Sequence, residues 1–367
     1  MNGLRARGRR LLAQAEDSRA IGRFLAADAF YPFWLQDIRE PSPEVIAEAE
    51  ASAGRAAEIA AELDDPELAS AALDALGGCA TAVDDWARAL EAARRRIAFE
   101  DRLGLYERMD AHAMVSWMSF LMGDLAEAER DSAEMVARIL PGQAPYPALH
   151  LFAWRTLTLT LLGRWDESAT MFWRALEAWN EAGRHAAGYG LRGFVCMIDV
   201  GRARRDARLE GPAAEAILSI VARFPPHHYN RSLIAYVVGD AGFTAADLSI
   251  TGRYPPELAE RRLCLACDNR QILPDSILEA ELAIAIRHRV PLLEAQVRRA
   301  IGLAHRDAAE LSTAIGIWER IGALPNLGRA RAERGLITRD AAETDAALGL
   351  LRALGDVDYV DRFSTMM

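Results

Sequence analysis

The chain has 367 residues and a formal net charge of −10, and all 43 of its basic residues are arginine, because the sequence contains no lysine. This composition excludes a P-loop lysine, a pyridoxal Schiff base and the strand lysine of protein kinases, since each uses that ammonium group directly. An acidic chain is also a poor partner for nucleic acid or an anionic membrane. We therefore expect no direct nucleic-acid binding and no membrane association.

Three features of the sequence predict that the protein is cytoplasmic. The basic first residues are not followed by the apolar core of a secretory signal. The apolar runs are far shorter than the roughly 18–20 residues of a membrane-spanning helix. Four cysteines in a chain of this length give no disulfide framework, which predicts a reducing environment.

Helical periodicity dominates from the first long segment onward. Residues 44–63 carry apolar side chains at spacings of three and four with charges between them, which predicts an amphipathic helix. Asp64, Asp65 and Pro66 then predict a helix end followed by a capped start with proline in the first turn. We expect further breaks at Gly77-Gly78, Gly123-Asp124, Pro141-Gly142, Gly163-Arg164, Gly211-Pro212, Pro225-Pro226, Pro255-Pro256, Pro274-Asp275 and Pro325.

A repeat emerges when the segments are aligned on their glycines. Gly123 and Gly163 lie 40 residues apart in similar surroundings, and Gly302 offers a third copy. Trp179 and Trp318 follow Gly163 and Gly302 at the same offset, behind a small residue at a matching position. A small residue lets two helices approach, and a large aromatic fills the space to the next pair, so this pattern predicts stacked helix hairpins with the two tryptophans in the core.

The repeats resemble degenerate tetratricopeptide repeats. Residues 287–356, with Ile317-Trp318-Glu319-Arg320-Ile321-Gly322-Ala323 among them, are similar to the C-terminal helical region of bacterial class III nucleotide-cyclase fusions and of MalT-like LuxR regulators. The resemblance is looser over 66–225 and fades over 226–275. No cyclase domain, nucleotide-binding domain or terminal helix-turn-helix is visible, so we expect the sensor or scaffold part alone, without those families' activities.

These patterns predict an all-α fold, a right-handed α-solenoid of about eight tetratricopeptide-like helix pairs. No run shows the period-two alternation of a strand. We divide the chain into an N-terminal arm with a first helix (1–43), repeats (44–225), an irregular helical region (226–275), further repeats (276–356) and a tail (357–367).

Several motifs have a structural explanation that we favour over a chemical one. Residues 188–193 spell G-x-G-x-x-G, but no βαβ unit surrounds them, so we expect close helix packing. Cys264 and Cys267 lack the second ligand pair of a zinc site. Asp64-Asp65 and Asp84-Asp85 lie at expected helix starts and predict caps. We therefore assign no catalytic residue, no metal ligand and no cofactor.

The concave face of such a solenoid is the expected binding surface. Trp117 and Phe120 precede Gly123 at offsets that line the groove in tetratricopeptide-like repeats, and Arg164 and Glu167 fall on the same face. An aromatic side chain in a groove edged with charge is a plausible recognition residue. Trp117, Phe120, Arg164 and Glu167 are our candidate binding residues, with packing within the repeat as the alternative.

The predicted function is recognition. We favour a protein-interaction or effector-sensing module of a bacterial regulatory or signalling system, including transcriptional regulation, that binds a peptide, a partner domain or a small effector. The alternative is an enzyme or small-molecule-binding protein with a pocket enclosed by the superhelix, for which His112, His150, Tyr146 and Tyr189 would be the converging groups. The sequence leaves the oligomeric state open.

Overall fold

The computed structural model describes residues 2–12, 14, 16–35, 40–185, 187–225, 228–237 and 255–365. Within these ranges the chain forms helices, turns and connecting segments, and no described residue belongs to a strand. The predicted all-α class is therefore confirmed for the described part of the chain. None of the described helices is both long enough and apolar enough to span a bilayer.

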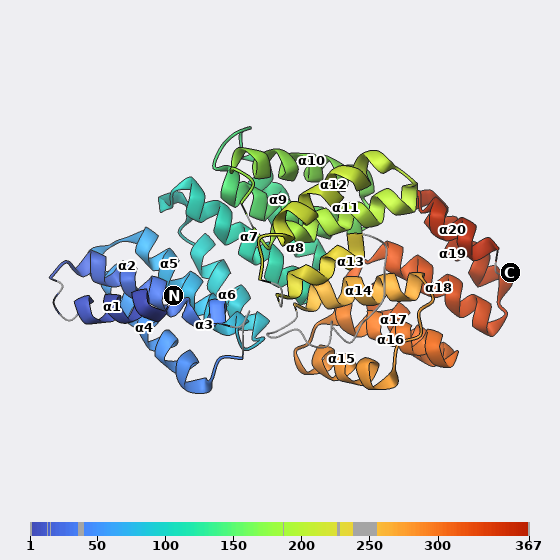
Figure 1. Cartoon of the computed structure of the whole chain (residues 1–367), viewed down its shortest axis with the longest axis horizontal. Helices are drawn as coiled ribbons and strands as arrows, with labels where there is room; N and C mark the ends of the chain where they lie inside the picture. Colours follow the sequence, from blue (N-terminus) through green and yellow to red (C-terminus); the bar gives the residue numbers. More distant parts are fainter. Residues whose placement is uncertain are drawn as a thin grey trace. The chain divides into compact units, whose positions relative to one another are not determined.

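The chain divides into two compact units, which are described separately. The first unit extends to Met118. Its helices, blue to cyan in Figure 1, are α1 (Asn2–Leu12), α2 (Ser18–Ala29), α3 (Tyr31–Leu35), α4 (Pro43–Leu63), α5 (Pro66–Thr81), α6 (Trp86–Ile97), the short η1 (Glu100–Arg102) and most of α7 (Leu105–Leu121).

The second unit comprises the described residues from Ser119 onward. Its helices are α8 (Leu125–Ala137), α9 (Pro145–Leu161), α10 (Trp165–Glu181), α11 (Gly190–Arg204), α12 (Ala207–Val221), η2 (Tyr229–Ser232), α13 (Leu233–Val237), α14 (Pro256–Asp268), α15 (Asp275–Arg287), α16 (Pro291–His305), α17 (Ala308–Ile321), α18 (Leu324–Thr338), α19 (Ala341–Leu354) and α20 (Val357–Ser364).

Helices pack mainly on their neighbours in sequence, as in a helical repeat. In the first unit α5 packs on both α4 and α6. In the second unit the closest pairs are α9 with α10, α11 with α12, α16 with α17 and α18 with α19. Trp179 and Trp318, predicted as core residues, are buried. The predicted caps are confirmed, because Asp65 accepts from the Leu68 N–H and Asp85 from the Arg88 N–H.

A recurring six-residue turn joins three of the pairs in the second unit. It reads GRARRD at 201–206, GLAHRD at 302–307 and GLITRD at 335–340. The arginine before the aspartate has a left-handed φ of 55°, 53° and 60°, respectively. The aspartate caps the next helix, and its own N–H donates to the glycine carbonyl at 2.7, 2.9 and 2.8 Å. This hydrogen bond closes each helix with the geometry of a Schellman motif.

Gly302 shows why this turn has glycine at its first position. A Cβ there would lie 2.7 Å from Leu311 Cγ and 3.0 Å from the Asp307 carbonyl oxygen. Gly302 therefore lies inside α16, where the next helix crosses closely. Gly123 and Gly163 instead occupy left-handed turn positions, with φ of 79° and 76°. The alignment of Gly302 with these two glycines was therefore wrong in register.

Two predicted breaks were also wrong. Helix α5 continues through Gly77 and Gly78, because these glycines admit neighbouring elements rather than end the helix; a Cβ on Gly78 would lie 3.2 Å from the Phe30 ring. Helix α12 continues through Pro212, and its buried face, which includes Ala216 and Ile217, keeps the segment helical. Of the predicted break at Pro225-Pro226, Pro226 lies outside the described residues.

Candidate functional site

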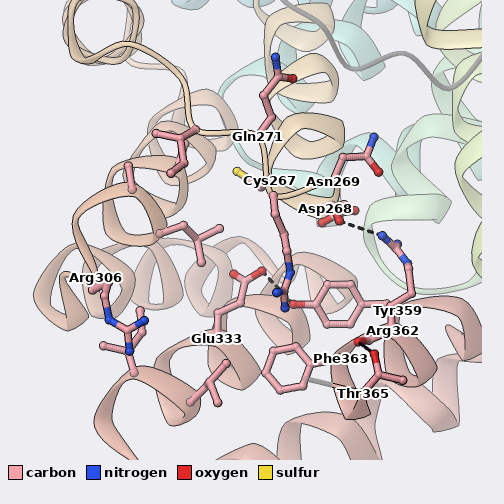
Figure 2. A pocket seen from close by; sticks show the side chains of 17 residues that line it. Cys267, Asp268, Asn269, Gln271, Arg306, Glu333, Tyr359, Arg362, Phe363 and Thr365 are labelled. Atoms are coloured by element: carbon pink, nitrogen blue, oxygen red, sulfur yellow. Dashed lines mark hydrogen bonds between the residues drawn. The ribbon is translucent and has the colours of Figure 1, made fainter. Parts of the chain in front are cut away.

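A cavity of about 570 Å³ lies in the second unit, where the C-terminal ends of α14, α16 and α18 meet α20 (Figure 2). Its walls come from the last residues of α14 and the turn after it, the last turns of α16 and α18, and one side of α20. This volume lies within the range of small-molecule sites. The cavity is therefore our candidate functional site.

The end of helix α14 forms one wall of the cavity, and the whole helix is packed among neighbouring helices. All of its residues are buried or half-buried, although several are charged. In its N-terminal half, Glu257 accepts from Arg192 of α11 at 3.0 Å, and Glu260 accepts from Asn326 of α18 at 3.2 Å. Buried polar groups need such partners, and these contacts set the position of α14 among its neighbours.

A buried ion pair holds the wall between α16 and α18. Arg299 donates to Glu333 from Nε at 2.8 Å and from a terminal nitrogen at 2.6 Å. The Tyr359 hydroxyl of α20 donates to the same carboxylate at 2.8 Å, a contact visible in Figure 2. Burial raises the pKa of Tyr359, and the Glu333 charge raises it further. Tyr359 therefore stays protonated and serves as a donor.

Asp268, the last residue of α14, joins this network to α18. It accepts from Arg299 at 2.7 Å and from Arg329 at 2.6 Å. Burial disfavours its charged form, but Arg329 and Arg299 outweigh that cost and hold the pKa of Asp268 below its usual value. Arg329 also donates to Asp356 at 2.7 Å. Asp268 is thus ionised, and the carboxylates of Asp268, Glu333 and Asp356 are all paired with arginines.

Helix α20 closes the cavity from another side. Arg362 donates to the backbone carbonyl of Asp268 at 2.8 Å, as Figure 2 shows, and pairs with Asp358 at 2.8 Å within the helix. Phe363 is buried and lines the cavity, and Thr365 lines it as well. The contact with Asp268 ties the C-terminal helix to the end of α14.

Two arginines of the lining remain outside this network. Arg270 and Arg306 are exposed, and neither forms an ion pair or side-chain hydrogen bond with any part of the chain that the structure describes. Both follow the end of a helix in left-handed backbone, with φ of 57° and 53°. A guanidinium without a carboxylate partner is suited to bind carboxylate or phosphate in bidentate fashion.

Two thiols lie near the end of α14: Cys267 lines the cavity and Cys264 does not. Cys264 and Cys267 are both buried. Burial raises the pKa of Cys264 to about 12 and also raises the pKa of Cys267. A protonated buried thiol is a poor nucleophile and a poor metal ligand. Among the described residues, no cluster of three His, Cys, Asp or Glu side chains has the arrangement of a metal site.

The predicted groove residues do not line this cavity. Phe120 is buried against Trp154, with ring centroids 6.0 Å apart, and Trp117 is half-buried. Arg164 pairs with Glu167 at the surface and with Glu129 at 2.9 Å. The concave-face site formed by these residues stays a prediction.

The groups named for an enclosed pocket are partly brought together. His150 and Tyr189 have ring centroids 4.4 Å apart, and Tyr146 lies 5.7 Å from Tyr189. His112 is in the first unit, where its Nε2 lies 3.0 Å from a Glu100 oxygen. None of these four side chains lines the cavity at the end of α14.

Sequence reasoning missed Arg270, Arg306, Glu333 and Tyr359 as site residues. They come from segments that no local motif connects, and the cavity forms only when three helix ends converge on α20. One signal was present. The G-x-x-x-R-D turn places Arg306 in the same local position as Arg205 and Arg339, and it marks the helix ends at which such a site could form.

The chain matches no protein-family model and no curated protein. The geometry of the cavity is therefore the basis for its functional interpretation.

Proposed function

We propose that this chain is an effector-sensing or protein-interaction module of a bacterial regulatory system, and that the cavity between α14, α16, α18 and α20 is its ligand site. The finer fold belongs to the same proposal: a cytoplasmic, right-handed solenoid of about eight tetratricopeptide-like pairs. One observation carries the functional part, namely a cavity of about 570 Å³ whose polar wall is fixed by buried ion pairs.

The size of the cavity favours a small effector or the end of a peptide over a whole domain. Its wall is rigid, because Arg299, Glu333 and Tyr359 hold one another in place. A preorganised wall lowers the ordering cost of binding. Helix α20 contributes Tyr359 and Phe363 to the cavity, so a bound effector would stabilise the docking of this helix.

A pocket-filling variant tests this proposal. Ala304 lines the cavity, whereas Ala309 is exposed on α17, so Ala304→Trp and the matched control Ala309→Trp add the same side chain inside and outside the site. Thermal unfolding is measured with a panel of organic acids, alkyl amines, sugars, nucleotides and short peptides. We expect at least one class to raise the melting temperature of the native chain and of Ala309→Trp but not of Ala304→Trp. No shift for any class, or an equal shift in Ala304→Trp, would contradict the proposal.

A further inference from the structure

Both carboxylates in the cavity wall are already paired with arginines and are not available to bind a cationic ligand. Glu333 is engaged by two nitrogens of Arg299 and by the Tyr359 hydroxyl. Asp268 accepts from Arg299 and Arg329. A cationic ligand would have to break these buried pairs, which is costly because it leaves a buried charge uncompensated.

The available charges at the cavity are positive. Arg362 is held by Asp358 and by the Asp268 carbonyl, but Arg270 and Arg306 have no such partner among the described residues. The negative ends of α14 and α16 favour a basic residue nearby. Arg339 occupies the same position after the end of α18 but does not line the cavity. The attraction of an arginine to the negative end of a helix therefore occurs with or without a ligand site.

The remaining lining is largely apolar. Leu303, Leu336 and Phe363 contribute hydrocarbon surface, and Leu336 keeps 37% of its surface exposed. Covering such surface gains roughly 25 cal/mol per Å² of apolar area. A ligand that uses both the arginines and this surface must be amphiphilic.

We propose that the cavity binds an amphiphilic organic anion. Its carboxylate or phosphate group contacts Arg270 and Arg306, and its apolar body lies against Leu303, Leu336 and Phe363. This inference rests on the proposed function, because it names the ligand class of the same site. Arg270 and Arg306 are the residues that determine specificity for the anion.

Four probes with the same octyl chain separate charge from apolar contact: octanoate, octyl phosphate, octanol and octylamine. Their dissociation constants are measured by calorimetry with the full chain at low salt, for the native sequence and for the double variant Arg270→Gln/Arg306→Gln. Arg339→Gln is the matched control, because Arg339 has the same left-handed turn and exposed position outside the cavity. Circular dichroism checks that every variant is folded.

We expect one or both anions to bind the native chain at least about tenfold tighter than octanol, a difference of about 1.4 kcal/mol. The double variant should bring the anions to within about twofold of octanol, and Arg339→Gln should leave all affinities unchanged. The better of octanoate and octyl phosphate identifies the acid group. Octanol or octylamine binding as tightly as both anions, or an unaffected double variant, would overturn the anion inference alone. No binding of any probe would overturn the inference together with the proposed site.

Discussion

Arg299 holds Glu333 through two hydrogen bonds, at 2.8 and 2.6 Å, and both side chains are buried. This pair joins α16 to α18 in the wall of the cavity and compensates the charge of Glu333. The architecture of the site therefore depends on a contact that a ligand need not touch.

Glu333→Gln is expected to destabilise the second unit by about 3 kcal/mol or more, because it leaves the buried Arg299 charge only partly compensated. The control is Glu319→Gln, which removes a carboxylate paired with Arg331 at the surface and should cost at most about 1 kcal/mol. Urea unfolding measures both free energies. Equal losses of unfolding free energy in the two variants would show that the contribution of the Arg299–Glu333 pair to stability does not depend on its burial.

Gly302→Ala is expected to lower the free energy of unfolding by at least about 1 kcal/mol, although alanine favours helix. The added Cβ would lie 2.7 Å from Leu311 Cγ and 3.0 Å from a backbone oxygen, so the gain in propensity is lost to overpacking. A Cβ added to Gly316 in α17 would meet only open space, so Gly316→Ala should stabilise by up to about 1 kcal/mol. A stabilising Gly302→Ala would refute the close helix approach.

Arg306→Gly should separate stability from binding. Arg306 and Arg339 both have left-handed backbone, and replacing either by glycine relieves roughly 1 kcal/mol of strain. Both variants should therefore unfold at higher temperature. Arg306→Gly should in addition weaken binding of the tighter of octanoate and octyl phosphate, whereas Arg339→Gly should not. Equal affinities of the two variants for that anion would remove Arg306 from the site.

The environment of Asp74 predicts that the stability of the first unit depends on pH. Burial raises its pKa to about 7, and the nearby Asp110 and Glu107 add to this effect while Arg96 opposes it. The folded chain holds this proton more tightly than the unfolded chain. The contribution of protonated Asp74 to the free energy of unfolding is therefore complete below its usual pKa near 4 and is lost as the pH rises through about 7.

Asp74→Asn should therefore flatten the decline in the stability of the first unit between about pH 4 and 7. The control is Asp64→Asn, which removes an exposed carboxylate that pairs with Arg102 in the same unit. Unfolding free energies across this pH range measure the effect. A curve for Asp74→Asn that parallels the native one would show that Asp74 does not titrate there.

Much of the fold could be predicted because its signals are local. The amphipathic pattern of 44–63 became α4, and the caps at Asp65 and Asp85 were correct. Two of the errors fell on glycines, at Gly78 and Gly302, where a residue that permits a turn also permits a close approach. Sequence alone does not distinguish these two uses, because the distinction depends on which helix packs alongside.

The cavity could not be predicted because its residues are joined only by tertiary packing. Arg270 and Arg306 follow different helices, and Tyr359 meets Glu333 only when α20 docks on α18. Repeat offsets instead favour aromatic residues on the first helix of a hairpin, and one of these, Phe120, packs against Trp154.

Hydrogen–deuterium exchange with and without the tighter-binding of octanoate and octyl phosphate tests the central claim most directly, because it locates a bound ligand along the intact chain. We predict slower exchange in segments 267–272, 300–306, 333–337 and 359–365, which line the cavity, and no change in α9 or α10. Protection confined to other helices, or no protection at concentrations of this anion that saturate binding, would contradict the assignment of this cavity as the ligand site.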